Sequence, residues 1–133
     1  MDHINFLTCG KRIELFNRKT RIMYLAVDAC FQYIYLFEKS KYEIKNKYKM
    51  QIKNIMLIKK GYDYKFNFYS FFFGYPKQSE CFSLIGFNDN EENVAFVIKC
   101  QNEKEVELWL ESLYYLSEYL YKLNKIKKIP ILK

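Results

Sequence analysis

Four cysteines and one histidine are the residues of this chain best suited to metal or redox chemistry. They are widely separated, with no C-x-x-C pair, and lie at Cys9, Cys30, Cys81, Cys100 and His3. A structural zinc site needs about four such ligands at close and regular spacing. The pattern instead predicts reduced, mostly buried thiols of a cytosolic protein, so we expect neither a metal ion nor another cofactor.

The remaining polar residues give little support for catalysis. The sequence has no glycine-rich phosphate loop, no G-x-S-x-G and no H-E-x-x-H motif, the patterns that mark common nucleotide, acyl-transfer and metalloprotease sites. Asp28, Glu38 and Glu43 are better interpreted as surface charges than as an acid–base pair, and His3 is too isolated to act as a base. We therefore expect no catalytic residue in this chain.

Charge is distributed unevenly along the sequence. The net charge is +7, but residues 11–47 hold nine basic and four acidic side chains, a net of +5. Residues 80–121 hold two basic and nine acidic ones, a net of −7. A basic face attracts anionic lipid or nucleic acid, but the acidic remainder argues against a protein that wraps nucleic acid. No apolar run reaches the roughly 18 residues of a spanning helix, so we expect any contact with a membrane to be peripheral.

Short runs rich in branched and aromatic residues predict the elements that position these charges. They indicate an antiparallel meander of seven strands, at residues 11–17, 21–27, 31–37, 48–52, 55–60, 81–87 and 94–100. The recurrence of Ile52, Ile55 and Ile58 every three residues also fits a helix. We favour two strands there, because Lys53 and Asn54 form a natural bend between them.

A change of period after the last strand predicts one amphipathic helix. Its apolar stripe consists of Val106, Trp109, Leu110, Leu113, Leu116, Leu120 and Leu123. Asn102 is placed to cap the first turn, with Glu105 three residues later. The expected fold is mainly β, a seven-stranded bent antiparallel sheet whose open end is covered by this C-terminal helix, with Trp109 as a structural core residue.

The segment from residue 62 to 79 is unusually aromatic. Alternation at Tyr62, Tyr64, Phe66 and Phe68 is typical of an additional strand. The run that follows, Phe71, Phe72 and Phe73, is expected to be partly buried at the mouth of the barrel, since exposed phenylalanines favour aggregation. The alternative is an exposed loop that inserts into a membrane or binds a partner.

Several short patterns carry a family resemblance. Residues 105–113 read E-x-x-L-W-x-x-x-L, residues 81–84 read CFSL, and Arg21 opens a strand that reads RIMYL. With these residues the chain resembles a pleckstrin homology (PH) domain over residues 6–121. It is most similar to the N-terminal PH domain of the delta-type phosphoinositide-specific phospholipases C. We expect a lead-in at 1–9, the PH-like domain at 10–123, and a basic tail or linker at 124–133.

The resemblance implies a lipid-headgroup site between the first two strands and the connection after the third. The implied headgroup contacts are Arg18, Lys19, Arg21, Lys39 and Lys41. Arg21 takes the key arginine position of the family, and several converging cations are needed because a phosphate carries up to two charges. The strand-one lysine positions of the family are occupied here by Leu15 and Asn17, and neither is cationic.

The function that this resemblance implies is peripheral targeting to the inner, cytoplasmic face of a membrane. The ligand would be a phosphoinositide or another anionic phospholipid headgroup, and the chain would be a regulatory domain of a signalling phosphoinositide phospholipase C whose catalytic part lies elsewhere. The alternative is a PH-fold protein-interaction module without specific lipid binding, which uses the acidic helix face or the aromatic segment.

Overall fold

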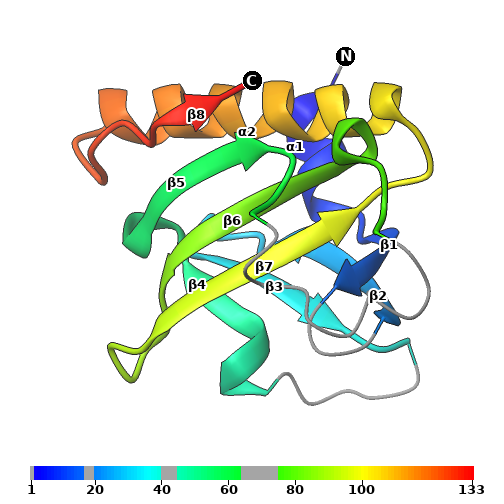
Figure 1. Ribbon diagram of the computed structural model, residues 1–133. Helices are drawn as coiled ribbons and strands as arrows, with labels where there is room; N and C mark the ends of the chain where they lie inside the picture. Colours follow the sequence, from blue (N-terminus) through cyan, green and yellow to red (C-terminus); the bar gives the residue numbers. More distant parts are fainter. Residues whose placement is uncertain (1, 17–19, 40–44, 64–74) are drawn as a thin grey trace.

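One bent β-sheet and one long helix make up most of the domain. The computed structural model describes residues 2–16, 20–39, 45–63 and 75–133 (Figure 1). Its helices and strands are α1 (His3–Thr8), β1 (Lys11–Phe16), β2 (Thr20–Val27), β3 (Tyr33–Phe37), η1 (Asn46–Tyr48), β4 (Lys49–Gln51), η2 (Ile52–Asn54), β5 (Ile55–Lys60), η5 (Gln78–Glu80), β6 (Cys81–Phe87), β7 (Asn93–Lys99), α2 (Glu103–Lys122) and β8 (Ile131–Leu132). The predicted fold class, mainly β with one long C-terminal helix, is confirmed.

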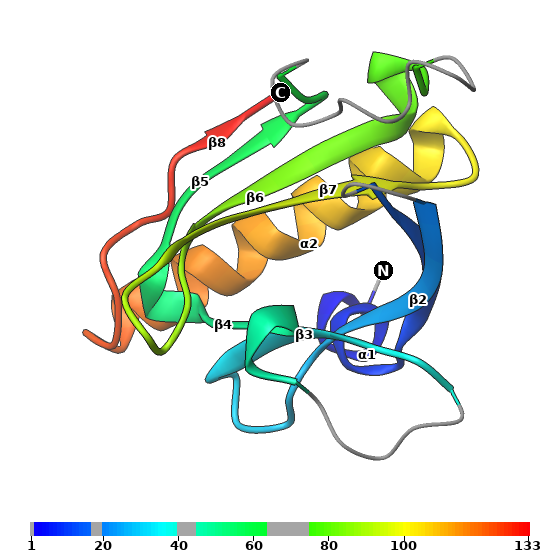
Figure 2. The same cartoon turned by 60° about the horizontal axis from the view of Figure 1, so that its bottom comes forward.

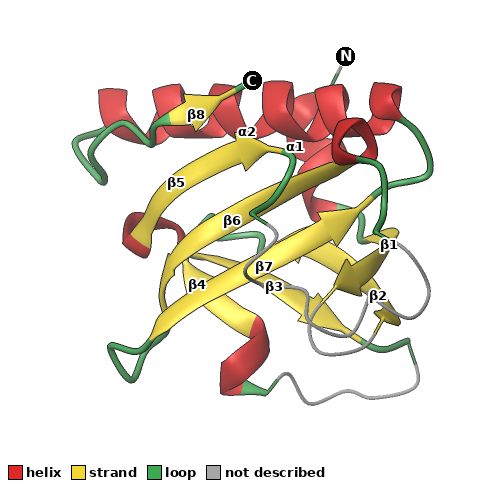
Figure 3. Ribbon diagram, in the orientation of Figure 1, coloured by secondary structure: helices red, strands yellow, loops and turns green. Residues whose placement is uncertain are grey.

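The eight described strands form a single sheet in the order β4-β3-β2-β1-β7-β6-β5-β8 (Figure 3). All neighbouring pairs are antiparallel except β5 and β8, which are parallel. Alternate residues of the strands face the core, as Ile13 and Leu15 do in β1 and Met23 and Leu25 do in β2. The sheet therefore bends around one apolar interior.

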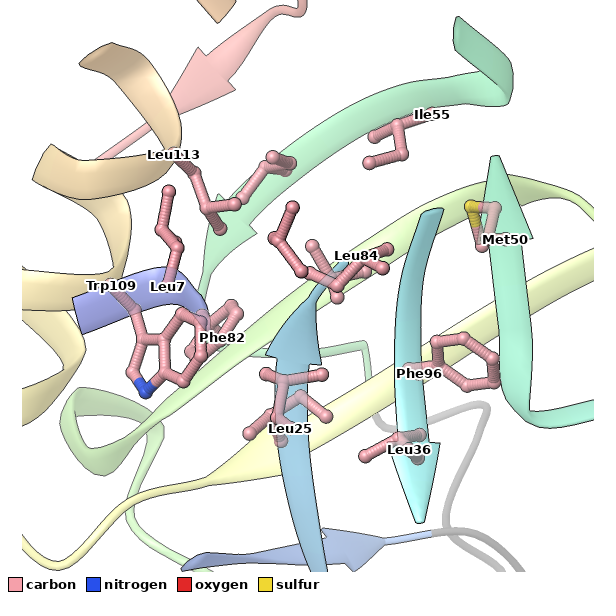
Figure 4. Packing of buried hydrophobic residues seen from close by; sticks show 14 of the residues in the cluster. Leu7, Leu25, Leu36, Met50, Ile55, Phe82, Leu84, Phe96, Trp109 and Leu113 are labelled. Carbon is pink, nitrogen blue, oxygen red and sulfur yellow. The ribbon is translucent and has the colours of Figure 1, made fainter. Parts of the chain in front are cut away.

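Helix α2 covers one end of this bent sheet (Figures 1 and 2). Asn102 caps it, because its side-chain oxygen accepts a hydrogen bond from the Glu105 N–H. Trp109 is fully buried, with its ring centroid 4.9 Å from that of Phe6 and 5.9 Å from that of Phe82 (Figure 4). Burial of each buried valine or leucine of the stripe stabilises the fold by roughly 1.5–3 kcal/mol, so the stripe holds α2 on the sheet.

The N-terminal stretch forms a helix that the sequence analysis did not predict. Helix α1 is capped by Asp2, whose carboxylate accepts a hydrogen bond from the Asn5 N–H. Leu7 of α1 is fully buried in the core, and Phe6 packs edge-on against Trp109. Residues 3–8 are therefore in contact with the rest of the domain.

The C-terminal segment also packs against the domain. Asn124 adopts a positive φ of 57°, and the Lys125 N–H donates to the Leu120 carbonyl, so the chain reverses at the end of α2. The Ile129 N–H then donates to the Ser117 hydroxyl, and β8 pairs with β5. The domain limits at residues 10 and 123 stay a prediction, and in the structure the segments on both sides pack against the domain.

The third strand is shorter than predicted. It begins at Tyr33, not at residue 31, because the Asp28 carboxylate accepts hydrogen bonds from the N–H groups of Gln32 and Tyr33 and holds a turn there. Phe31 lies within that turn with a φ of 57°. The prediction of strand at residues 31 and 32 is wrong for this local reason.

The preference for two strands around Ile52, Ile55 and Ile58 is correct. A short 3-10 turn, η2, separates β4 from β5, and all three isoleucines are buried. Ile52 and Ile55 are one 3-10 turn apart, and the pairing of β5 with β6 is irregular between Ile55 and Leu57. These two departures from strand alternation let a three-residue repeat face one core. The possible strand at 62–68 lies mostly, and the Phe71–Phe73 run entirely, outside the described residues. At the start of this segment Tyr62 is buried, and its hydroxyl donates a hydrogen bond to the Pro76 carbonyl.

Gly86 in β6 allows η2, the 3-10 turn between β4 and β5, to pack closely against β6. A Cβ atom there would overlap the Asn54 carbonyl oxygen and lie 2.8 Å from the Met50 sulfur. We expect Gly86→Ala to lower the free energy of unfolding by about 1–3 kcal/mol through overpacking against backbone. Urea unfolding followed by circular dichroism measures this, with the exposed Asn93→Ala as a control. Equal stability of the two variants would contradict the close approach.

Candidate functional site

Arg21 is a basic residue that the fold places on the core-facing side of a strand, near the open end of the bent sheet. It lies near the start of β2, on the same strand face as Met23 and Leu25, and its cross-strand neighbour on β1 is the buried Leu15. Strand alternation therefore directs the guanidinium toward the mouth of the bent sheet. Its side chain is 37% exposed there.

Two side chains from other elements hold the guanidinium. Arg21 Nη1 donates a hydrogen bond to the Tyr48 hydroxyl at 3.3 Å and lies 3.6 Å from Glu38 Oε1. Tyr48 ends η1 and is buried, whereas Glu38 follows the end of β3. The ammonium group of Lys47 lies over the Tyr48 ring, 5.0 Å from its centroid. The mouth thus combines two cations, a phenol and a carboxylate.

Lys39, the other described residue of the predicted headgroup set, points elsewhere. Its ammonium group lies 5.8 Å from the centroid of the Tyr24 ring. Tyr24 is on the opposite face of β2 from Arg21, since the two are three residues apart in a strand. The structure therefore does not bring Lys39 together with Arg21. Arg18, Lys19 and Lys41 lie outside the described residues.

Sequence reasoning did not identify Tyr48 and Glu38 as neighbours of Arg21. The sequence analysis predicts Glu38 as a surface charge, and Lys47 is not in the predicted headgroup set. These residues are 17 or more positions from Arg21, so the contact depends on how three separate elements meet. The only available signal was the position of Glu38 directly after a predicted strand.

The chemistry that this mouth supports is the binding of a small anion. A guanidinium presents several donors in a planar fork that matches phosphate oxygens. Leu15 supplies no second cation from β1, because it is apolar and only 2% exposed. Glu38 partly neutralises Arg21, so an incoming anion has to displace that carboxylate.

A different polar cluster lies at the opposite end of β3. The Asp89 carboxylate accepts hydrogen bonds from the Gln51 amide at 2.9 Å and the Tyr33 hydroxyl at 3.0 Å. The bond from Gln51, with a smaller contribution from Tyr33, holds the pKa of Asp89 below its usual value of 3.8. Burial, followed by the bond to Asp89, raises the pKa of Tyr33. This cluster ties the β6–β7 turn to β3 and β4.

Metal binding and membrane spanning find no support within the described part of the chain. No group of three or more His, Cys, Asp or Glu residues is arranged there to hold a metal ion. Cys9 and Cys30 are exposed, while Cys81 and Cys100 are buried. Burial raises the pKa of Cys81 to about 12 and also raises that of Cys100. No helix among these residues is both long and apolar enough to cross a membrane.

Comparison with known proteins identifies the fold. No family model and no curated protein matches the sequence. Among solved structures, PLC21 from S. officinalis superposes with a TM-score of 0.59 at 16% identity, over 86% of this chain and 16% of the PLC21 chain. The PH domain from TgAPH gives a TM-score of 0.63 at 12% identity, covering 90% of this chain and 89% of that one.

A third match is the hSac2 domain from human phosphoinositide phosphatase Sac2, with a TM-score of 0.58 at 11% identity, over 93% of this chain and 74% of that one. At these identities the matches show the fold alone, and that fold is PH-like. The chain spans about a sixth of the length of the PLC21 protein that it matches. Similarity to the delta-type phospholipases C stays a prediction.

The Asp89 cluster predicts an acid-dependent contribution to stability. Because folding lowers the pKa of Asp89, its contribution is present above pH 3.8 and is lost as the pH falls below that value. Asp89→Asn should therefore lower the free energy of unfolding at neutral pH, and the difference from the parent chain should shrink in acid. Denaturant unfolding at several pH values measures this, with Glu91→Gln in the same turn as the control. A difference that stays constant with pH would contradict the assignment.

The cysteines are expected to fall into two reactivity classes. Cys9 and Cys30 are exposed, whereas burial keeps Cys81 and Cys100 protonated and out of reach of reagents. We expect an alkylating reagent at neutral pH to label the first pair quickly and the second pair only after unfolding. Peptide mass spectrometry with and without denaturant distinguishes them. Rapid labelling of Cys81 in the folded chain would refute this.

Proposed function

We propose that this PH-like domain attaches reversibly to anionic membranes by binding phospholipid headgroup phosphates at Arg21. The observation that carries the proposal is the inward-facing guanidinium at the mouth of the sheet, positioned by the Tyr48 hydroxyl. Lys47 adds a second charge at the same mouth through its contact with the Tyr48 ring. A headgroup phosphate matches this arrangement in both charge and donor geometry.

Other cations extend the site in this proposal. Lys39 lies over the Tyr24 ring on the outer face of β2, where it would contact the membrane surface and not the headgroup held by Arg21. Arg18, Lys19 and Lys41 belong to the neighbouring connections in the sequence. Each basic residue near an anionic surface contributes about 1 kcal/mol. Beside Arg21, β1 carries Leu15 and no lysine. We therefore expect membrane attraction that depends strongly on the charge of the headgroup. Phosphoinositides should be preferred, because their phosphate monoesters carry up to two charges each.

The biological setting that we propose is the cytoplasmic face of a membrane, as a regulatory domain of a signalling protein. The sequence resemblance and the structural likeness to PLC21 favour a phosphoinositide phospholipase C as that protein. The catalytic step would then belong to other parts of it. In this setting the domain would hold the protein at the membrane and would catalyse no reaction itself. The Phe71–Phe73 run would insert into the membrane.

A protein-interaction role is the second candidate. Exposed tyrosines on α2 favour it, since Tyr114, Tyr115, Tyr119 and Tyr121 are each more than two-fifths exposed. Tyrosine is enriched at protein interfaces because it combines apolar area with a polar tip. The two candidates differ in the residues that they require, which makes them separable by experiment.

Vesicle binding by three variants tests the proposed function. We expect Arg21→Ala to weaken binding to phosphoinositide vesicles about fivefold, the effect of losing roughly 1 kcal/mol. Glu38→Gln should strengthen binding, because it removes the carboxylate that competes for Arg21. Lys104→Ala, an exposed lysine at the start of α2, is the control and should differ little from the parent chain.

Co-sedimentation at physiological salt provides the measurement, with phosphatidylserine vesicles and vesicles of single phosphoinositides at matched charge. Binding that is equal on all vesicles and disappears with salt would reduce the site to a basic surface. If Arg21→Ala and Glu38→Gln both bind like the parent chain, the Arg21 site is refuted. No binding by any variant would favour the protein-interaction role.

A further inference from the structure

A pocket lies at the end of β3 away from the Arg21 site. It has a volume of about 470 Å³ and lies between the β2–β3 turn, η2 and the C-terminal end of α2. This volume falls within the range of roughly 300–1,000 Å³ that is usual for small-ligand sites. Gln32, which lines the pocket, precedes β3, whereas Glu38 at the Arg21 mouth follows β3. The two sites are therefore separated by the length of that strand.

The floor of the pocket is apolar and its rim is basic. Ile52 and Leu120 are buried, and Ile126 packs against the same core. Lys53 and Lys125 line the pocket and are exposed. None of the described lining residues is acidic. Lys53 also interacts electrostatically with Asp89, so Lys125 is the cation less engaged with protein carboxylates.

One wall of the pocket is formed by a residue in an unfavourable backbone conformation. Phe31 has a φ of 57°, a region that bulky residues rarely adopt and that costs them about 1–2 kcal/mol. Asp28 holds the turn through hydrogen bonds to Gln32 and Tyr33, and the Phe31 ring meets that of Tyr119 edge-on at 6.2 Å. Asparagine or glycine would fit this backbone better. The Phe31 side chain packs against the core and lines the pocket in spite of this backbone strain, and strained residues cluster at ligand sites.

The opposite wall is set by the end of α2. The Asn124 N–H donates to the Tyr121 carbonyl and the Lys125 N–H to the Leu120 carbonyl, a Schellman arrangement with Asn124 in the left-handed region. This reversal brings Lys125 and Ile126 beside Leu120. The pocket thus has two well-defined walls, each formed by a hydrogen-bonded turn.

We propose that this pocket binds a single-chain anionic amphiphile, such as a long-chain carboxylate. The alkyl chain of this ligand would lie on the floor formed by Ile52, Leu120 and Ile126, against the Phe31 ring. The carboxylate would lie at the rim with Lys125, where a cation and solvent are both available. An uncharged amphiphile would leave the rim lysines unused, and a free small anion would leave the apolar floor unused.

Calorimetric titration of the intact chain with decanoate, below the concentration at which decanoate forms micelles, tests this proposal. We expect Lys125→Glu to weaken binding about tenfold or more, since it reverses the rim charge. Phe31→Asn should weaken binding while leaving the fold intact, because asparagine tolerates the left-handed conformation. Lys104→Glu, the same charge reversal at the other end of α2, is the matched control and should bind like the parent chain.

Two ligand controls and one protein control complete the design. Decyl maltoside has the alkyl chain without the charge, and acetate has the charge without the alkyl chain. We expect both to bind at least tenfold more weakly than decanoate. Arg21→Ala should bind decanoate normally, which keeps this result separate from that of the vesicle experiment. The proposal is overturned if decanoate does not bind, if decyl maltoside binds equally well, or if Lys125→Glu and Lys104→Glu behave alike.

Discussion

The burial of Trp109 is the contact on which the rest of the domain depends. The indole ring packs against Phe6 of α1 and Phe82 of β6, so one side chain joins both helices to the sheet. Its Nε1 has no hydrogen-bond partner among the described residues, a defect that costs about 1–3 kcal/mol. The apolar area of a buried indole, at 25 cal/mol per Å², contributes roughly 4–6 kcal/mol. The free energy gained by burying the indole exceeds the cost of its unpaired N–H, so Trp109 holds α2 on the sheet.

This placement of α2 decides where polar function can lie. Since α2 covers one end of the sheet, apolar residues fill the interior behind it, and Leu25 of β2 is fully buried in that core. Near the start of the same strand, away from that cover, the same alternation places Arg21 at the mouth. A charged side chain is tolerated there because it remains more than a third exposed and finds partners in Tyr48 and Glu38. One strand thus serves both the core and the candidate site.

The sequence predicts those parts of the fold that repeat a local pattern. The apolar runs of β6 and β7 and the stripe of α2 are long enough to be recognised, and these elements are found as expected. The exception is Leu123, which is predicted in the stripe but follows the last helical residue and is exposed. Helix α1 has only six residues, too few to show a period, and β8 depends on pairing with β5, which no local pattern encodes. The predicted strand start at Phe31 is wrong, and β3 begins at Tyr33, because the Asp28 side chain, not strand propensity, sets the turn. The partners of Arg21 could not be predicted locally, because they depend on how β2, β3 and η1 meet in the tertiary structure.

The pairing of Arg21 with Glu38 has a consequence for selectivity. Both side chains are about a third exposed, so the pair is screened by solvent and is worth no more than about 1 kcal/mol. A singly charged headgroup gains little by replacing one carboxylate with another anion of equal charge. A phosphate monoester carries up to two charges and can accept two parallel hydrogen bonds from the guanidinium. Under the proposed function, Glu38 would therefore compete with the ligand for Arg21. The site would then select ligands by the charge on their phosphates and not by the stereochemistry of the ring that carries them.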